Sequence, residues 1–179
     1  MKFYFTSDCH FGHDKIREYS NRPFKSLKEM DTTLIRNWNA RVKPEDTVFH
    51  IGDFCFKNSP NAVARGEGGI KSPQSCEKML NGKIIFIKGN HDGHNNVKTP
   101  ITRMTIVYGG KTILLIHDPM DIVNIGNHNL VFCGHVHTDW ETNKIGGIDV
   151  INVGVDVNKF RPVSLEELLK KVRTVRTKS

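Results

Sequence analysis

Five short polar segments of the chain hold residue types that bind divalent cations, and each follows a run of apolar residues. The segments are Asp8-Cys9-His10, Gly52-Asp53, Gly89-Asn90-His91-Asp92, His117 and Gly134-His135-Val136-His137. The third comes directly after 83–88, whose apolar and β-branched residues predict a buried strand. In α/β sheets ligands collect at the carboxyl ends of strands, and Gly89 lets the backbone turn sharply there. We therefore expect the five segments to meet in space.

The donor atoms in these segments favour transition metals over Ca or Mg. They are two carboxylates, four imidazoles and one carboxamide oxygen, from Asp8, Asp53, His10, His117, His135, His137 and Asn90. Such a mixed set suits Mn, Fe, Zn, Ni or Co, whereas Ca and Mg prefer oxygen ligands alone. Seven ligands exceed one tetrahedral site, and two metals that share a carboxylate would use them all. Asp53 is the natural bridge because it stands alone in its segment.

Hydrophobic periodicity predicts the elements that position these segments. Strands are expected over 2–6, 47–51, 83–88, 104–108, 111–116, 130–133, 144–145 and 148–153. Ser26 with Glu29 predicts a capped helix to about residue 40, and Ser164 with Glu167 predicts another to about residue 172. A short helix is expected over 74–80, after a loop over 57–75 with one helical turn near Ala62. Strands alternate with helices early and form hairpins late, which favours a mixed α/β sandwich.

Composition indicates one soluble domain. We expect a single domain over 1–169 and a basic tail over 170–179, and the absence of a signal sequence or apolar span predicts a cytoplasmic protein with no membrane contact. The net charge of +7 falls to +2 without the basic residues of that tail, so the charge gives little support for a nucleic-acid partner. The cysteines lack metal-binding or disulfide spacing and are expected to be small buried residues.

The order of the five polar segments resembles that of the calcineurin-like metallophosphoesterase superfamily, and especially its small single-domain bacterial and phage phosphoesterases. The resemblance runs from near the first residue to beyond residue 137, and three further stretches are also similar. These stretches are Arg22-Pro23-Phe24, Trp38-Asn39 and Asn152-Val153-Gly154-Val155-Asp156. The resemblance implies a four-layer αββα sandwich, in which two mixed β-sheets pack face to face with helices outside.

The same resemblance implies a dinuclear hydrolase of phosphodiesters, phosphomonoesters or both. It assigns Asp8, His10, Asp53 and His137 to one metal, and Asp53, Asn90, His117 and His135 to the other. Mn is the foremost cofactor, with Fe, Ni, Zn and Co as alternatives. A hydroxide that bridges the two cations would attack phosphorus. His91 would protonate the leaving group as general acid, and Asp92 would orient either the loop or the imidazole.

The substrate is less defined than the metal site. His13, Arg22, His94 and Arg161 are candidates for contacting it, because two lie in loops beside the ligands and two can bind phosphate. An open cleft without a cap domain would admit a small phosphoester, such as a nucleotide or a cyclic nucleotide. Nucleic acid is disfavoured because the body of the chain is nearly neutral. The oligomeric state does not follow from the sequence.

The sequence leaves two other interpretations to compare with the hydrolase. His135-Val136-His137-Thr138-Asp139 fits the start of a metallo-β-lactamase motif, but Trp140 stands where that motif needs a histidine. That interpretation also leaves Asp8 and Asn90 without a role. The second alternative is a non-catalytic scaffold or interaction module, because a fold can persist after its chemistry is lost. The complete ligand set and His91 favour the hydrolase, and hydrolysis after chelation and re-addition of metal discriminates the two.

Overall fold

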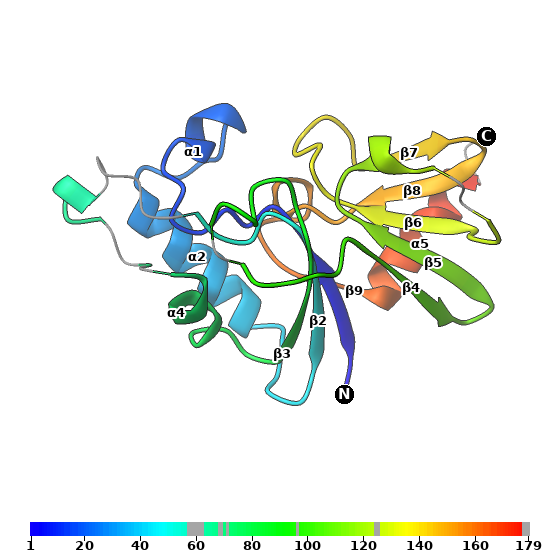
Figure 1. The fold of residues 1–179 in the computed structure, drawn as a ribbon, viewed down its shortest axis with the longest axis horizontal. Coiled ribbons are helices and arrows are strands. Elements are labelled where there is room, and N and C mark those ends of the chain that lie inside the picture. The colour runs from blue at the N-terminus through cyan, green and yellow to red at the C-terminus, as the bar shows by residue number, and fades with distance from the viewer. Residues whose placement is uncertain (57–62, 68–69, 71, 96, 124–125, 177–179) are drawn as a thin grey trace.

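The computed structural model describes residues 1–56, 63–67, 70, 72–95, 97–123 and 126–176. Within these ranges the strands form a four-stranded sheet in the order β3-β2-β1-β9 and a five-stranded sheet in the order β4-β5-β6-β8-β7 (Figure 1). The first sheet contains β1 (Phe3–Thr6), β2 (Thr47–Ile51), β3 (Lys83–Ile87) and β9 (Val163–Ser164). The second contains β4 (Arg103–Tyr108), β5 (Lys111–Ile116), β6 (Leu130–Cys133), β7 (Thr142–Ile145) and β8 (Ile148–Asn152).

The first sheet places the ends of three parallel strands at one edge. β1 pairs with β2 and β2 with β3 in parallel, while β9 runs antiparallel to β1. The polar segments that follow β1, β2 and β3 therefore leave the sheet on the same side. β3 lies at the edge of this sheet, and of its residues only Ile87 is buried. The expectation of a fully buried strand there is corrected, because an edge strand has a neighbour on one side alone.

The second sheet is also mixed. The predicted hairpin of β4 and β5 is present, and β5, β6 and β8 are parallel to one another. β7 and β8 close the sheet as an antiparallel pair. Parallel pairing brings the ends of β5 and β6 together, so that His117 and Gly134 begin neighbouring loops.

An apolar core fills the space between the two sheets. Phe5 of the first sheet stacks on Phe49 with ring centroids 5.2 Å apart and meets Phe132 of the second sheet edge to face at 5.0 Å. Leu165 and Leu168 of α5 pack into the same cluster. Aromatic pairs of this kind add about 0.5–1.5 kcal/mol beyond the area that they bury. The mixed α/β sandwich of two sheets with helices is confirmed.

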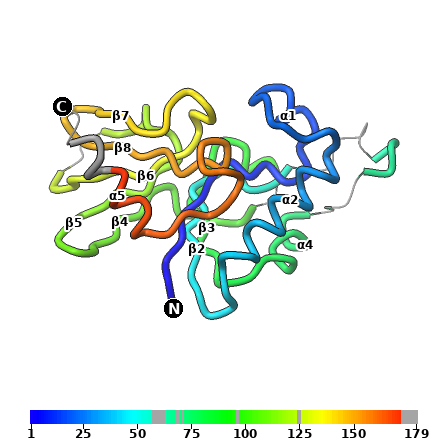
Figure 2. Tube along the Cα trace, turned by 180° about the vertical axis from the view of Figure 1, so that it is seen from behind, coloured from blue at the N-terminus to red at the C-terminus, as the bar shows by residue number. Residues whose placement is uncertain are grey.

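The helices are distributed unevenly over the two sheets. α1 (Ile16–Tyr19), α2 (Leu27–Asn39) and α4 (Pro73–Glu77) lie beside the first sheet, whereas α5 (Leu165–Arg176), seen from behind in Figure 2, follows β9 and contacts β9 and β1. Trp140 and Ile122 pack on the outer face of the second sheet. Ile122 directly follows the 3₁₀ helix η1 (Pro119–Asp121). A second 3₁₀ helix, η2 (Val155–Val157), precedes β9.

Helix caps agree with the sequence, whereas two helix boundaries do not. Ser26 Oγ accepts from the Glu29 N–H, and Ser164 with Glu167 forms the second predicted capping box. α4 begins earlier than expected because Ser72 caps it, and it ends at Glu77. α5 continues to Arg176, so the predicted boundary at residue 170 falls inside a helix.

Three further expectations concern the cysteines, the loop and the membrane. Cys9, Cys55, Cys76 and Cys133 are free and buried, as predicted. The helical turn expected near Ala62 lies outside the described residues. In the part of the chain that the structure describes, every helix is too short or too polar to cross a bilayer.

Candidate metal centre

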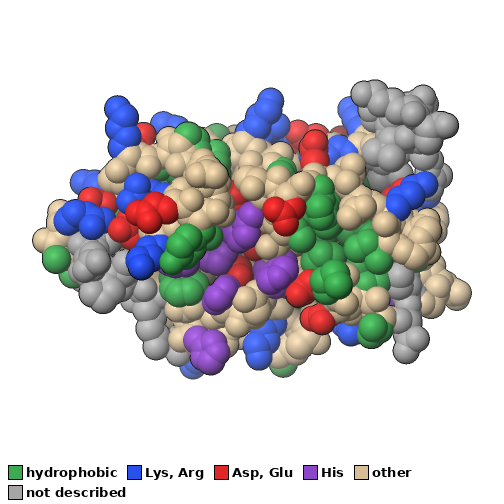
Figure 3. Space-filling model, turned by 90° about the horizontal axis from the view of Figure 1, so that it is seen from above, with side chains coloured by type: hydrophobic (Ala, Val, Ile, Leu, Met, Phe, Trp, Pro, Cys, Tyr) green, Lys and Arg blue, Asp and Glu red, His purple; other side chains and the backbone are tan. Residues whose placement is uncertain are grey.

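The five polar segments meet where the ends of the two sheets face each other. The Asp8 N–H donates to the Gly52 carbonyl, and the Gly134 N–H donates to the His117 carbonyl, each at 3.0 Å. Ser7 and Gly154 form a parallel bridge that joins the loop after β1 to the one after β8. Seen from above, histidine and acidic side chains gather at the centre of this face (Figure 3).

Backbone strain is concentrated at the predicted ligands. Positive φ angles occur at Asp8 (56°), His10 (50°), Asp53 (57°), His135 (71°) and His137 (41°). A left-handed conformation costs a non-glycine residue about 1–2 kcal/mol. Such strain persists where the surrounding structure enforces it, and it clusters at functional sites. Here the positive φ angles turn the chain immediately after a strand, so that the candidate ligands of different segments point toward one another.

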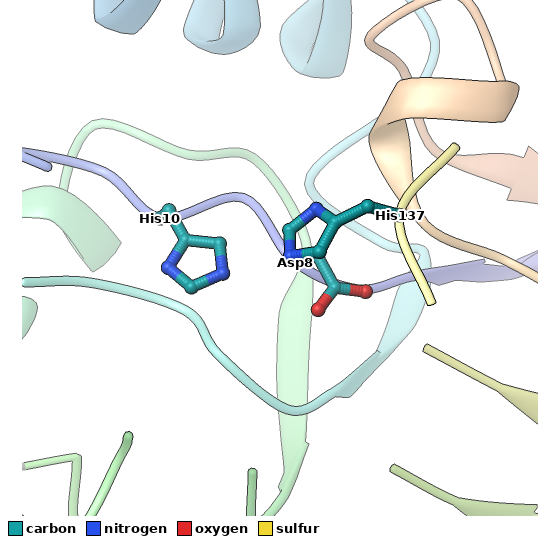
Figure 4. Close-up of side chains that lie close together, drawn as sticks. All are labelled: Asp8, His10 and His137. Atoms are coloured by element: carbon teal, nitrogen blue, oxygen red, sulfur yellow. The ribbon is translucent and has the colours of Figure 1, made fainter. Parts of the chain in front are cut away.

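Asp8, His10 and His137 form the first group of candidate ligands. Their donor atoms lie within 4.8 Å of one another, and Figure 4 shows the three side chains together. His10 is 2% exposed, and neither of its ring nitrogens has a hydrogen-bond partner. Burial lowers the pKa of His10 well below its usual range, so the imidazole is neutral. A buried neutral imidazole without hydrogen bonds is suited to bind a metal.

Asp53 joins the first group to a second one. Asp8, Asp53 and His117 also have donor atoms within 4.8 Å of one another. Asp53 Oδ2 lies 3.5 Å from His10 Nε2 and 3.6 Å from His117 Nε2, beyond ordinary hydrogen-bond lengths. Two donors that each lie about 2.1 Å from one tetrahedral cation are about 3.4 Å apart. The position of Asp53 between these two histidines suits a carboxylate shared by two cations.

Asn90 completes the second group together with His135. Asn90 Oδ1 lies 3.0 Å from His117 Nε2 and 3.3 Å from His135 Nδ1. The side chain of His135 is 40% exposed, and its Nε2 is 3.5 Å from Asp118 Oδ2. Asp118 directly follows His117 and was not among the residues predicted from the sequence. The structure therefore brings all seven predicted ligands together.

The electrostatics of the centre fit a bound cation. Burial raises the pKa of Asp8, which means that the interior opposes its negative charge. Burial also acts to lower the pKa of His117, but the charges of Asp8 and Asp53 outweigh it and raise that pKa. Buried carboxylates of this kind are stabilised by a positive charge nearby. The residues present thus fit divalent metal ions.

The loop after β3 places His91 and Asp92 differently. The His91 N–H donates to Asp53 Oδ1 at 3.0 Å, while its side chain is 47% exposed and its Nε2 lies 3.9 Å from Asp53 Oδ2. Asp92 is buried and accepts from the N–H groups of Asp53, Phe54 and Gly89 at 2.8–3.0 Å. His91 therefore faces the site, whereas Asp92 holds the loop. Of the two roles expected for Asp92, orienting the loop or orienting the imidazole, these hydrogen bonds favour the first.

Comparison with known proteins identifies the family. Residues 1–162 match the model of the calcineurin-like phosphoesterase superfamily domain. The chain belongs to this superfamily. Its fold is that of the metal-dependent phosphoesterases, and membership implies divalent metal ions at a site such as the one described above.

Three individual proteins are similar to this superfamily member. An uncharacterised protein of Methanocaldococcus jannaschii is 35% identical over 183 residues, which cover 98% of this chain and 96% of that protein. Gene 66 protein of Mycobacterium phage L5 is 26% identical over 167 residues, covering 81% and 73%. A solved structure, a protein of unknown function from Aquifex aeolicus, superposes with a TM-score of 0.68 at 30% identity, covering 94% of this chain and 98% of that one.

Two of the histidines of this phosphoesterase domain are oriented by groups behind them. His117 Nδ1 is 2.9 Å from the Ile51 carbonyl, and His137 Nδ1 is 2.8 Å from Asp156 Oδ2. Such partners fix the ring and its tautomer in metal sites. Asp156 had no predicted role, although it lies in the 152–156 stretch that resembles the family.

The four predicted substrate residues occupy different surroundings. His13 lies beside the ligands, stacked on Phe56 with ring centroids 3.9 Å apart, and burial lowers its pKa to about 4. His94 is exposed in the loop after β3. Arg161 is directed toward Glu167 of α5 at 3.5 Å. Arg22 is fully buried against Asp156, so the prediction that it binds substrate is wrong.

Replacing Gly89 with alanine is expected to damage the centre, because the backbones of two loops touch there. A Cβ at Gly89 would lie 2.3 Å from Asp53 Oδ1 and 2.4 Å from the Asp53 nitrogen. Overpacking of this kind lowers the free energy of unfolding by about 1–3 kcal/mol. Urea denaturation measures the loss of stability, and a Mn²⁺ titration measures the damage to metal binding. In the control Gly93→Ala the nearest atom is Lys88 Cε at 3.5 Å, so equal losses in the two variants would contradict the packing argument.

Replacing Asp92 with alanine is expected to destabilise the loop after β3. The variant leaves the backbone N–H groups of Asp53, Phe54 and Gly89 without their acceptor. One buried unsatisfied donor costs about 1–3 kcal/mol, so we expect the free energy of unfolding to fall by at least about 2 kcal/mol. Chemical denaturation without metal measures it. Asp139→Ala removes an exposed carboxylate and serves as the control; a similar stability in both variants would show that Asp92 does not hold the loop.

Proposed function

We propose that the protein is a dinuclear metal-dependent phosphoesterase that hydrolyses small phosphodiesters, phosphomonoesters or both. The observation that carries this proposal is the convergence of the seven ligands around Asp53, with His91 on the open side of the same cluster. His10 supports a metal role because its buried ring has no hydrogen-bond partner and its Nε2 lies 3.5 Å from Asp53 Oδ2.

The candidate ligands divide into two sets that share Asp53. We propose that Asp8, His10, Asp53 and His137 hold one cation, and that Asp53, Asn90, His117 and His135 hold the other. Mn²⁺ is the cofactor that we expect, with Fe, Ni, Zn and Co as alternatives. When bound, the cations supply an activated water nucleophile and offset the charge of the phosphoryl group.

His91 is the proposed general acid. Its backbone N–H is held by Asp53, while its ring stays 47% exposed and 5.9 Å from the ring of His10. It is therefore anchored at its backbone and free to donate a proton at the open side of the site. The departing oxygen of the substrate receives that proton, which removes the cost of expelling an alkoxide.

Two features beside the ligands suit a nucleotide-sized substrate. A cavity of about 220 Å³ is lined by Asn90 and His117, by Lys88 and Arg103, and by Asp118 and Asp121 among others. The stacked rings of His13 and Phe56 lie next to His91, and the ring centroids of Phe56 and His91 are 5.3 Å apart. An aromatic surface beside the general acid favours a planar leaving group, and nucleotides or cyclic nucleotides are the proposed substrate class.

Chelation and re-addition of metal tests the proposed function. Protein stripped of metal should hydrolyse neither a chromogenic phosphodiester nor a chromogenic monoester, and Mn²⁺ should restore turnover of at least one. On an alkyl phosphoester, whose leaving group needs a proton, His91→Ala should remain slow in the presence of Mn²⁺. If wild type and His91→Ala turned over both esters at the same low rate, the scaffold alternative would replace the hydrolase.

A further inference from the structure

A buried ion pair links the parts of the chain that carry the first group of ligands. Arg22 Nε and Nη2 donate to Asp156 Oδ1 and Oδ2 at 2.7 and 3.0 Å, and the two side chains are 0% and 1% exposed. Such a pair is geometrically specific, but burying both charges offsets much of its attraction. Asp156 also contacts the candidate ligand His137, and Arg22 also contacts the turn between Asp8 and His10.

Asp156 reaches the ligand His137. Its Oδ2 lies 2.8 Å from His137 Nδ1, and because a carboxylate only accepts hydrogen bonds, Nδ1 is the donor. The other ring nitrogen, Nε2, then carries the lone pair that a metal needs. His137 is 24% exposed, so packing alone constrains its ring incompletely. The carboxylate of Asp156 supplies the missing constraint on orientation and tautomer.

Arg22 reaches the turn that carries Asp8 and His10. Its Nη2 donates to the Asp8 carbonyl at 2.6 Å, and its Nη1 donates to the Cys9 carbonyl at 3.0 Å. Asp8 and His10 both have positive φ, so this turn is strained. The guanidinium binds the carbonyl groups in the strained arrangement, and it thereby holds the two side chains toward His137.

We propose that the Arg22–Asp156 pair is a positioning unit for one of the two metal sites. It rests on the metal centre proposed above, and it adds residues that lie behind the ligands. Because the contacts run to His137 and to the turn of Asp8 and His10, the effect should fall on the cation that these residues hold. The site of Asn90, His117 and His135 should keep its affinity.

The chain provides a matched control for an arginine that supports only the fold. Arg17 donates to the Asp14 carboxylate at 2.6 and 3.1 Å and to the Phe24 carbonyl at 3.1 Å. It thus makes the same kinds of contact as Arg22, a carboxylate and a backbone carbonyl. None of its partners is a predicted ligand. Arg17→Lys therefore reports the effect of the substitution itself.

Calorimetric titration with Mn²⁺ tests the proposal, using full-length wild type, Asp156→Asn, Arg22→Lys and Arg17→Lys stripped of metal. Loss of a group that orients a metal ligand typically weakens affinity about 10–100-fold. We expect that loss at one of two sites in Asp156→Asn and Arg22→Lys, and wild-type affinity in Arg17→Lys. The rise in Tm on adding Mn²⁺ should shrink in the same two variants, because it reports binding to the folded state.

Other results would overturn the proposal. A lower Tm without metal together with unchanged Mn²⁺ affinity would show that the pair supports the fold alone. If Arg22→Lys does not fold, Asp156→Asn decides, because asparagine fills the same volume. Nitrogen NMR of Zn²⁺-loaded wild type needs no variant: it should show His137 protonated at Nδ1, and protonation at Nε2 overturns the proposal. Wild type that binds Mn²⁺ without hydrolysing esters would contradict the phosphoesterase and leave this inference intact.

Discussion

Replacing His91 with alanine is expected to lower kcat for alkyl phosphoesters by about 10²- to 10⁴-fold, the usual contribution of general acid catalysis. The half-exposed ring of His91 lies beside the candidate ligands, where it can protonate the leaving group. The ring is not needed to hold the loop, because the contact with Asp53 comes from the backbone. Its backbone N–H to Asp53 survives the substitution. Steady-state kinetics on metal-loaded protein measures the effect, and the Mn²⁺ content should stay at the wild-type level.

The choice of leaving group makes this result specific to proton donation. A p-nitrophenolate leaves without a proton, so His91→Ala should lose much less activity on p-nitrophenyl esters than on alkyl esters. His128→Ala removes a histidine that contacts Thr105 away from the centre, and it should behave as wild type. Equal losses on the two classes of ester would show that His91 acts in some way other than as an acid.

Replacing Asp53 with asparagine is expected to abolish metal-dependent hydrolysis. Asp53 Oδ2 lies between His10 and His117, so a single substitution removes charge from both proposed cation sites. The loss of Mn²⁺ affinity should exceed the roughly 10- to 100-fold that follows loss of an outer partner. The fold should survive, because an asparagine oxygen can still accept from the His91 N–H. Calorimetry and thermal unfolding of the metal-free protein measure the two quantities separately.

Asp139→Asn is the control for Asp53→Asn. Asp139 is exposed, and its N–H donates to the Val136 carbonyl in a turn just after His137. It is also the residue that a metallo-β-lactamase-like motif would make a ligand, and its exposed position argues against that motif. Wild-type Mn²⁺ affinity in Asp139→Asn supports the assignment of Asp53. A larger loss in Asp139→Asn than in Asp53→Asn would contradict it.

The sequence predicted that the seven candidate ligands would meet, because each has a metal-binding residue type and follows an apolar run. Asp8, Asp53 and Asn90 each follow an apolar strand, and parallel strands end at a common edge. Strand pairing therefore brought these residues together without any knowledge of the loops. The two-sheet sandwich followed from the same alternation of strands, helices and hairpins.

The groups behind the ligands could not be predicted in the same way. The guanidinium group of Arg22 can bind phosphate, which made it a substrate candidate. Only the fold shows that it turns inward to Asp156, 134 residues away. Likewise, Asp118 gains its place near His135 through the pairing of β5 with β6. The partial exposure of β3 depends on its place at the sheet edge, which its apolar sequence does not reveal.

Metal content of the wild-type protein tests the central claim most directly. After loading with Mn²⁺ and dialysis, elemental analysis should give two Mn²⁺ per chain, because seven side chains around Asp53 offer two sets of donors. The same measurement on Asp53→Asn should give fewer than on wild type. A wild-type protein that retains one Mn²⁺ or none, and that shows no second binding step on titration, would contradict the dinuclear centre.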